Sequence, residues 1–121
     1  MSYTYSFEKL QVWSDARTLV TSIYKISDSF PITEKYGLTS QIRRAAISIV
    51  SNISEGSGRT SAKDQAHFYQ LAFSSLIEVL NQLIIAGDLS YVSESEIKNV
   101  RLHIEMVSNK LNSLRKNRLK G

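Results

Sequence analysis

Apolar residues recur at intervals of three and four along most of this chain, and that spacing places them on one face of an α-helix. The single proline and the five glycines fall between the periodic segments. No segment alternates apolar and polar residues for long enough to predict a β-strand. The sequence therefore predicts an all-α bundle in one domain, residues 1–121, with helices at about residues 7–29, 39–55, 62–87 and 94–117.

Serine residues mark the expected starts of three of these helices. Ser6 is the predicted N-cap of the first helix. Ser61 precedes Asp64, and Ser93 precedes Glu96, at the spacing of a capping box, in which a serine and an acid bond to each other's backbone. The most regular apolar stripe belongs to the fourth helix and consists of Ile97, Val100, Ile104, Val107, Leu111 and Leu114.

Residues 41–59 read QIRRAAISIVSNISEGSGR, an alanine-rich helix that ends in a Gly-Ser-Gly loop. The loop follows a helix and lacks the Gly-Lys-Ser/Thr ending of a phosphate-binding loop. Gly56 is therefore interpreted as the residue after the helix, in the left-handed conformation that glycine adopts without strain. Arg43 and Arg44 have two interpretations. They could form salt bridges between helices or subunits, or they could contact phosphates. Arg59 would add to the phosphate contacts.

The third predicted helix has a second stripe opposite its core stripe, and a helix with two apolar faces is expected to be buried on both. The predicted subunit interface combines this stripe with two aliphatic residues of the second helix, and its members are Ile47, Val50, Phe68, Leu71, Ser75, Glu78, Gln82 and Ile85. Arg43 or Arg44 of another helix is the expected partner of Glu78 or Gln82, because a buried carboxylate without a partner is costly.

The net charge is +4, and the excess is concentrated near the C-terminus. From residue 101 onward Glu105 is the only acid, and the cations are Arg101, Lys110, Arg115, Lys116, Arg118 and Lys120. One interpretation is a solvated helix end whose cations complement the helix dipole. The other is electrostatic binding of RNA or DNA through Lys110 and the four cations that follow it.

Near the N-terminus, Tyr3, Tyr5 and Phe7 could stack on nucleic-acid bases. A packed arm is the expected arrangement, because aromatic side chains are usually buried against apolar surface.

Several functional classes find no support in the composition. The absence of cysteine excludes disulfides and thiolate metal sites and favours a reducing, cytoplasmic compartment. We expect no signal peptide and no membrane span. Asp64 and His67 resemble half of a di-iron motif, but no second half accompanies them, so no metal and no cofactor are predicted. No nucleophile can be paired with a histidine and an orienting acid, so no enzymatic activity is predicted.

Four segments, "FEKLQVW", "GLTSQIRRAAISIVSNISEGSGR", "SLIEVLNQL" and "LSYVSESE", resemble the large-subunit rRNA intervening-sequence proteins. The resemblance spans nearly the whole chain and implies an up-down four-helix bundle that assembles into a homopentameric ring. It also implies kinship with the accessory variability protein of diversity-generating retroelements, a basic pentamer that binds nucleic acid and a reverse transcriptase.

Carried over by position, the family's motif residues are Gln41, Arg43, Arg44, Ser48, Asn52, Glu55, Gly56, Gly58, Arg59, Glu78 and Gln82. This chain departs from the family at Val50, where proline is frequent, at Ser54, where alanine is usual, and at Ser90, where glycine is common. Without the proline, the second helix is expected to be straighter at Val50.

Two functional hypotheses follow. The first is a non-enzymatic homo-oligomer, a pentamer by resemblance, that binds RNA or DNA through a ring of basic C-termini. The second is a protein-interaction scaffold with no direct nucleic-acid role, which docks a protein such as a reverse transcriptase-like enzyme.

Overall fold

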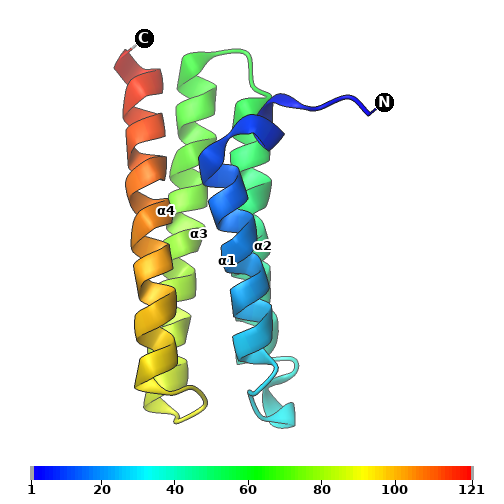
Figure 1. Cartoon of the computed structure of the whole chain (residues 1–121), viewed down its shortest axis with the longest axis vertical. Helices are drawn as coiled ribbons and strands as arrows, with labels where there is room; N and C mark the ends of the chain where they lie inside the picture. Colours follow the sequence, from blue (N-terminus) through cyan, green and yellow to red (C-terminus); the bar gives the residue numbers. More distant parts are fainter. Residues whose placement is uncertain (1, 121) are drawn as a thin grey trace.

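A computed structural model describes residues 2–120, and those residues contain helices and no strand. The elements are the 3-10 turn η1 (Ser6–Lys9), α1 (Gln11–Ser27), the 3-10 turn η2 (Ile32–Glu34), α2 (Leu38–Ser57), α3 (Ala62–Asp88) and α4 (Glu94–Lys120). The prediction of an all-α fold with four helices is confirmed. Figure 1 shows both chain ends and the α2–α3 connection at one end of the molecule, and the other two helix connections at the opposite end.

The caps of α3 and α4 agree with the sequence, whereas that of α1 does not. The Asp64 amide donates to Ser61 Oγ at 3.0 Å. The amides of Ser93 and Glu96 donate to each other's side chains at 3.1 and 3.2 Å. Ser6 was predicted to cap α1 but belongs to η1, because extended backbone at Leu10 separates that turn from the start of α1 at Gln11.

The prediction for Gly56 is wrong. Gly56 lies inside α2, which continues to Ser57, and no glycine among residues 2–120 has a positive φ. Close packing requires the glycine instead, because a Cβ built on Gly56 would come within 2.8 Å of Tyr69 Cε1 and 3.0 Å of Phe68 Cβ. Gly56 therefore permits α2 and α3 to approach each other closely near their connection.

The core runs the length of the bundle, and α3 packs against both α2 and α4. In α4, four residues of the predicted stripe are buried, and the outer two, Ile97 and Leu114, are partly buried. The apolar spacing of α3 predicts a core stripe of Tyr69, Phe73, Leu76, Leu80 and Leu83. The buried surface is broader, because it includes Ala72 and Val79, while Phe73 is only partly buried. This difference arises because α3 has a helix on either side.

By length and composition alone, α3 could cross a membrane, with a mean hydropathy of 1.3. One such helix is weak evidence, since the core helix of a bundle has the same character. Leu76, Val79 and Leu83 of α3 are fully buried among the other helices, whereas Leu71, Ile77, Ile84 and Ile85 of the same helix are exposed.

The α1–α2 and α3–α4 connections pack against each other. The Tyr91 hydroxyl donates to Glu34 Oε2 at 2.9 Å, and Ser29 Oγ donates to the Tyr91 carbonyl at 3.4 Å. The Phe30 and Tyr91 ring centroids are 5.7 Å apart. Ser90, in the α3–α4 connection, has a φ of 62°, a left-handed conformation that favours glycine.

Candidate nucleic-acid interface

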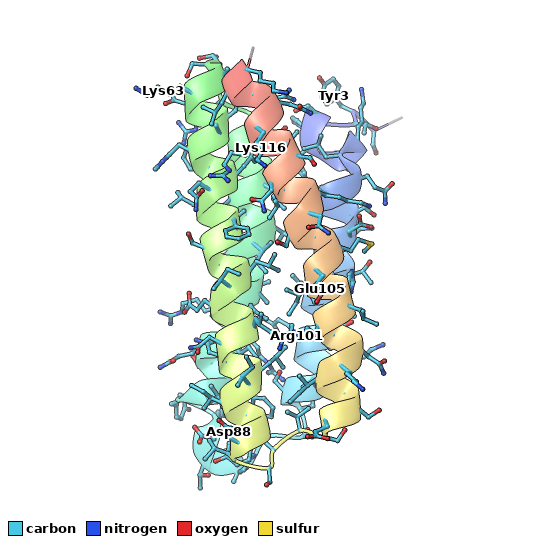
Figure 2. All side chains as sticks on the ribbon, turned by 90° about the vertical axis from the view of Figure 1, so that its left-hand side faces the viewer. Tyr3, Lys63, Asp88, Arg101, Glu105 and Lys116 are labelled. Atoms are coloured by element: carbon cyan, nitrogen blue, oxygen red, sulfur yellow. The ribbon has the colours of Figure 1, made fainter. Side chains whose placement is uncertain are left out.

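The end of the bundle that carries both chain ends is rich in cations. It comprises residues 2–9, 58–64 and 115–120, and we call it the basic end. Its acids are Glu8 and Asp64, and its cations are Lys9, Arg59, Lys63, Arg115, Lys116, Arg118 and Lys120. Figure 2 shows Lys63, Lys116 and Tyr3 at this end and Asp88 at the other.

The opposite end, residues 28–37 and 88–96, has the reverse charge, and we call it the acidic end. Lys35 is its only cation, and its acids are Asp28, Glu34, Asp88, Glu94 and Glu96. Phosphates would be repelled here and attracted at the basic end, so the bundle is electrostatically polar along its axis.

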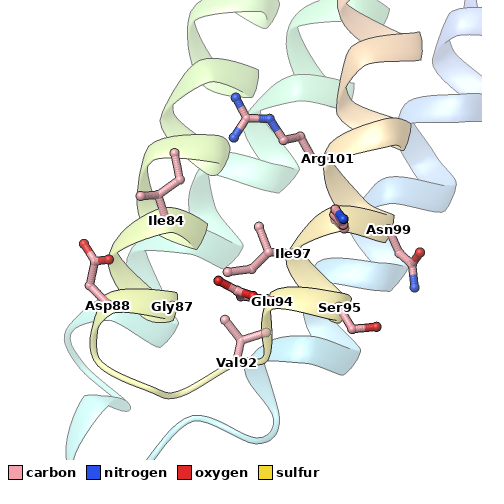
Figure 3. Close-up of a pocket in the computed structure, with 10 residues that line it drawn as sticks. Ile84, Gly87, Asp88, Val92, Glu94, Ser95, Ile97, Asn99 and Arg101 are labelled. Atoms are coloured by element: carbon pink, nitrogen blue, oxygen red, sulfur yellow. The ribbon is translucent and has the colours of Figure 1, made fainter.

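An open groove of about 870 Å³ lies beside the acidic end, between α3 and α4. Its lining is mixed, with Ile84, Val92 and Ile97 as the apolar side chains, and Figure 3 shows Ile84 of α3 and Ile97 of α4 on either side of it. Asp88, Glu94 and Arg101 contribute charge to its rim. This mixture suits a protein segment better than a phosphate backbone.

Two of the predicted cations of α4 are held by neighbouring helices. Lys110 pairs with Asp15 of α1, and Arg115 donates to Gln70 of α3. Burial alone would raise the pKa of the Asp15 carboxyl, but hydrogen bonds from Lys110 and Gln11 outweigh that effect and lower the pKa below its usual value. Lys110 and Arg115 thus attach α4 to the bundle.

The final turns of α4 leave other cations accessible. Lys116 and Lys120 are exposed and form no ion pair within residues 2–120. Arg118 is half-buried near Tyr69. Burial raises the pKa of the Tyr69 hydroxyl, and the charge of Arg118 and a hydrogen bond with it oppose that rise.

The arginines of residues 41–59 separate into different environments. The Arg43 side chain donates to Ser27 Oγ at 2.7 Å and to Asp28 Oδ1 at 2.8 Å, so it forms a salt bridge between α2 and α1. Arg59 pairs with Glu55 at 2.9 Å, and its guanidinium lies 4.4 Å from the centre of the Phe68 ring.

Arg44 is exposed on α2, and no ion pair in the part of the chain that the structure describes includes it. The sequence analysis expected Arg43 or Arg44 to pair with Glu78 or Gln82. Within the described chain, Glu78 accepts instead from Gln82 Nε2 at 3.3 Å.

The predicted subunit interface is only partly an outward surface. Ile47, Leu71, Glu78 and Ile85 are exposed. The other members lie at seams between helices because α3 has a helix on either side. Ser75 Oγ donates to Ser48 Oγ of α2 at 2.9 Å, Gln82 is 6% exposed, Phe68 lies under Arg59, and Val50 packs against the core.

The N-terminal arm differs from the expected packed arm. Phe7 is partly buried and lies 5.0 Å from Trp13 between ring centroids. Tyr3 and Tyr5 remain 77% and 60% exposed. The structure therefore brings two accessible rings to the end where the cations gather.

Sequence reasoning did not include Lys9 and Lys63 among the candidate cations. Both are exposed at the basic end, although they are far in sequence from the C-terminus. The available signal was the order of the helices. In a bundle of four alternating helices, the start of the first and third helices lies beside the end of the fourth.

Within residues 2–120, no group of three or more histidine, cysteine, aspartate or glutamate side chains could hold a metal ion.

Comparison with known proteins gives one family match. The family model described as 23S rRNA-intervening sequence protein matches residues 8–113, which include all of α1, α2 and α3 and most of α4. No curated protein matches the chain at a significant level.

Proposed function

The chain belongs to the 23S rRNA-intervening sequence protein family, and on that premise we propose that it is a non-enzymatic, homo-oligomeric protein that binds RNA or DNA through its basic end. The family name suggests an association with rRNA. The protein is proposed to act in the cytoplasm, without a cofactor, because its sequence lacks cysteine and a recognisable catalytic pair.

The polarity of the bundle carries this proposal. Lys9, Lys63, Lys116 and Lys120 are exposed together at one end, whereas the helix connections at the other end carry an excess of acids. Exposed lysines on a convex surface favour contacts to phosphates, which hold a nucleic acid without reading its sequence. We therefore expect binding that tolerates different sequences and weakens steeply with salt.

Exposed apolar side chains support the oligomeric part of the proposal. Ile47 of α2 and Leu71 and Ile85 of α3 are each exposed. We propose an up-down bundle that forms a homopentameric ring, in which five basic ends act together and raise the overall affinity.

A second candidate function is a scaffold that docks a protein, such as a reverse transcriptase-like enzyme. The groove between α3 and α4 favours it, since its lining combines apolar and charged side chains, as protein-binding surfaces do. Recovery of a protein partner after nuclease treatment, together with failure to bind nucleic acid at low salt, would support the scaffold over the nucleic-acid proposal.

The test compares two triple variants by fluorescence anisotropy with labelled RNA over a range of salt concentrations. Lys63→Gln/Lys116→Gln/Lys120→Gln removes three exposed cations from the basic end. Lys25→Gln/Lys35→Gln/Lys98→Gln removes three exposed cations from elsewhere and is the matched control. We expect the first variant to bind more weakly and to lower the slope of log affinity against log salt by about 2, at roughly 0.7 per phosphate contact.

Equal effects of the two triple variants, or no binding by the wild-type protein at low salt, would contradict the proposal. Light scattering of the wild-type protein and of Leu71→Lys measures the oligomer. We expect the variant to form smaller species because lysine would place a charge in the interface. A monomeric wild-type protein would remove the oligomeric part.

A further inference from the structure

The N-terminal arm holds a row of aromatic rings that continues into α1. The Tyr3 and Tyr5 ring centroids are 4.8 Å apart, those of Tyr5 and Phe7 are 6.5 Å apart, and Phe7 meets Trp13 at 5.0 Å. The Arg17 guanidinium lies 4.8 Å from the centre of the Trp13 ring. The inner rings are anchored to the bundle, and the outer two extend from it.

The backbone of the arm is fixed by specific contacts. The Tyr5 amide donates to Glu8 Oε1 at 2.9 Å, which closes the η1 turn. The Ser6 and Ser57 hydroxyls are 2.7 Å apart, so the arm is joined to the last residue of α2. Because the arm is held at Tyr5 and Ser6, the Tyr5 ring loses less conformational entropy when a ligand binds.

The outer rings are not covered by the rest of the chain. Tyr3 is 77% exposed and Tyr5 is 60% exposed. The planes of these two rings meet at 75°, so their contact covers a face of only one of them, and the Tyr5 ring also stacks on Phe7 at an interplanar angle of 20°. Flat ring surface therefore remains open to a ligand, which is a costly arrangement for a side chain with no partner.

The open rings share the basic end with the exposed lysines. Figure 2 shows the C-terminal part of α4, with Lys116, between the arm that carries Tyr3 and the start of α3 that carries Lys63. Proteins that bind single strands combine these two features, because cations hold the phosphates while aromatic rings stack on the bases. In a duplex the bases are already stacked on one another and offer no free face.

We propose that Tyr3 and Tyr5 form a stacking platform that selects single-stranded over double-stranded nucleic acid. This inference rests on the proposed function, since the cations of the basic end supply the contacts to the backbone. Each ring takes one base without regard to its identity, because every base has a π-face.

The test measures the affinity of the full-length protein for a labelled oligonucleotide of about 12 nucleotides, within the usual range for such sites, and for a duplex of the same length. We expect the wild-type protein to prefer the single strand. Tyr3→Ala/Tyr5→Ala is expected to lose affinity for the single strand by about tenfold or more and to keep its affinity for the duplex.

Three controls sharpen the result. Tyr3→Phe/Tyr5→Phe keeps the ring faces and is expected to bind as the wild type does. Tyr36→Ala removes a tyrosine that is 89% exposed at the acidic end, and is expected to change neither affinity. Circular dichroism of each variant checks that the bundle is folded.

The possible failures are distinguishable. Unchanged single-strand affinity in Tyr3→Ala/Tyr5→Ala, or an equal loss for both forms of nucleic acid, overturns the stacking platform. If that happens while Lys63→Gln/Lys116→Gln/Lys120→Gln still weakens binding of both forms, the proposed function stands without the platform. Failure of the wild-type protein to bind either form overturns both.

Discussion

The two ends of the bundle are closed in different ways. At the acidic end, two helix connections interlock through the Tyr91–Glu34 and Ser29–Tyr91 hydrogen bonds, and Phe30 and Val92 are buried there. At the basic end, the Ser6–Ser57 contact joins the arm to α2, and two tyrosines and several lysines remain exposed. The acidic end is therefore held together by packed connections, whereas the basic end resembles a binding surface.

This difference concerns how strongly packing constrains each end. Interlocked connections restrain both pairs of helices, so residues of the acidic end are constrained by packing. At the basic end the restraints are the close approach of α2 and α3 at Gly56 and single side-chain contacts such as Ser6–Ser57. Charges and rings can be placed there at little cost to the fold.

The largest expected effect comes from a pair of glycine substitutions, one toward each end. Gly56→Ala is expected to lower the free energy of unfolding by about 2 kcal/mol, because its Cβ would overlap the buried Tyr69 ring. Gly87→Ala is expected to change it by less than about 0.5 kcal/mol. Its Cβ would meet only the Cδ1 end of Ile97, which can rotate away, and alanine favours the helix. Urea denaturation measures both.

Equal destabilisation by the two substitutions would show that the approach at Gly56 is no tighter than that at Gly87. Tyr69→Phe serves as a control, since it keeps the ring that Gly56 accommodates and removes only the hydroxyl. We expect Gly56→Ala to remain costly in that background, because the overlap involves the ring itself.

Periodicity was sufficient to predict the helices but not the lateral contacts of α3. The spacing of apolar residues located all four helices, and the serine caps at Ser61 and Ser93 marked two starts. A helical wheel shows the faces of a single helix and assumes that one face packs against the core while the opposite face points outward. Ser75 and Gln82 were therefore placed on an outward face, although Ser75 bonds to Ser48 of α2 and Gln82 is buried.

The candidate site was partly predictable for a related reason. The C-terminal cations are adjacent in sequence and were found there, but sequence alone does not reveal that Asp15 and Gln70 hold two of them. Gly56 was misinterpreted because glycine serves both left-handed turns and close helix contacts, and only the position of Tyr69 distinguishes the two. The exposure of Tyr3 and Tyr5 depends on where η1 directs the arm.

A second comparison concerns the helix connections at the two ends. Ser90, at the acidic end, adopts a φ of 62°, so Ser90→Gly is expected to stabilise the protein by about 1 kcal/mol. At the basic end, Gly58 has a φ of −88°, and a Cβ there would make only ordinary contacts. Gly58→Ala is therefore expected to stabilise by about 0.5 kcal/mol. Thermal unfolding measures both, and destabilisation by Ser90→Gly would contradict the assigned conformation.

The smallest expected effect concerns two ion pairs, one between α1 and α4 and one at the acidic end. The lowered pKa of Asp15 means that its pairing with Lys110 stabilises the folded chain above the ordinary value of 3.8, and this contribution is lost as the pH falls through the lowered pKa. Asp15→Asn is expected to cost about 0.5 kcal/mol at neutral pH, because Lys110 is partly exposed to solvent. The difference in free energy of unfolding between Asp15→Asn and the wild type should shrink as the pH falls below the pKa of a free carboxyl. Asp28→Asn, at the acidic end, removes the carboxylate of a more exposed pair and is expected to cost less. Urea denaturation at several pH values separates the two, and a cost for Asp15→Asn that persists at low pH would mean that Asp15 stabilises α1 and α4 by packing instead of charge.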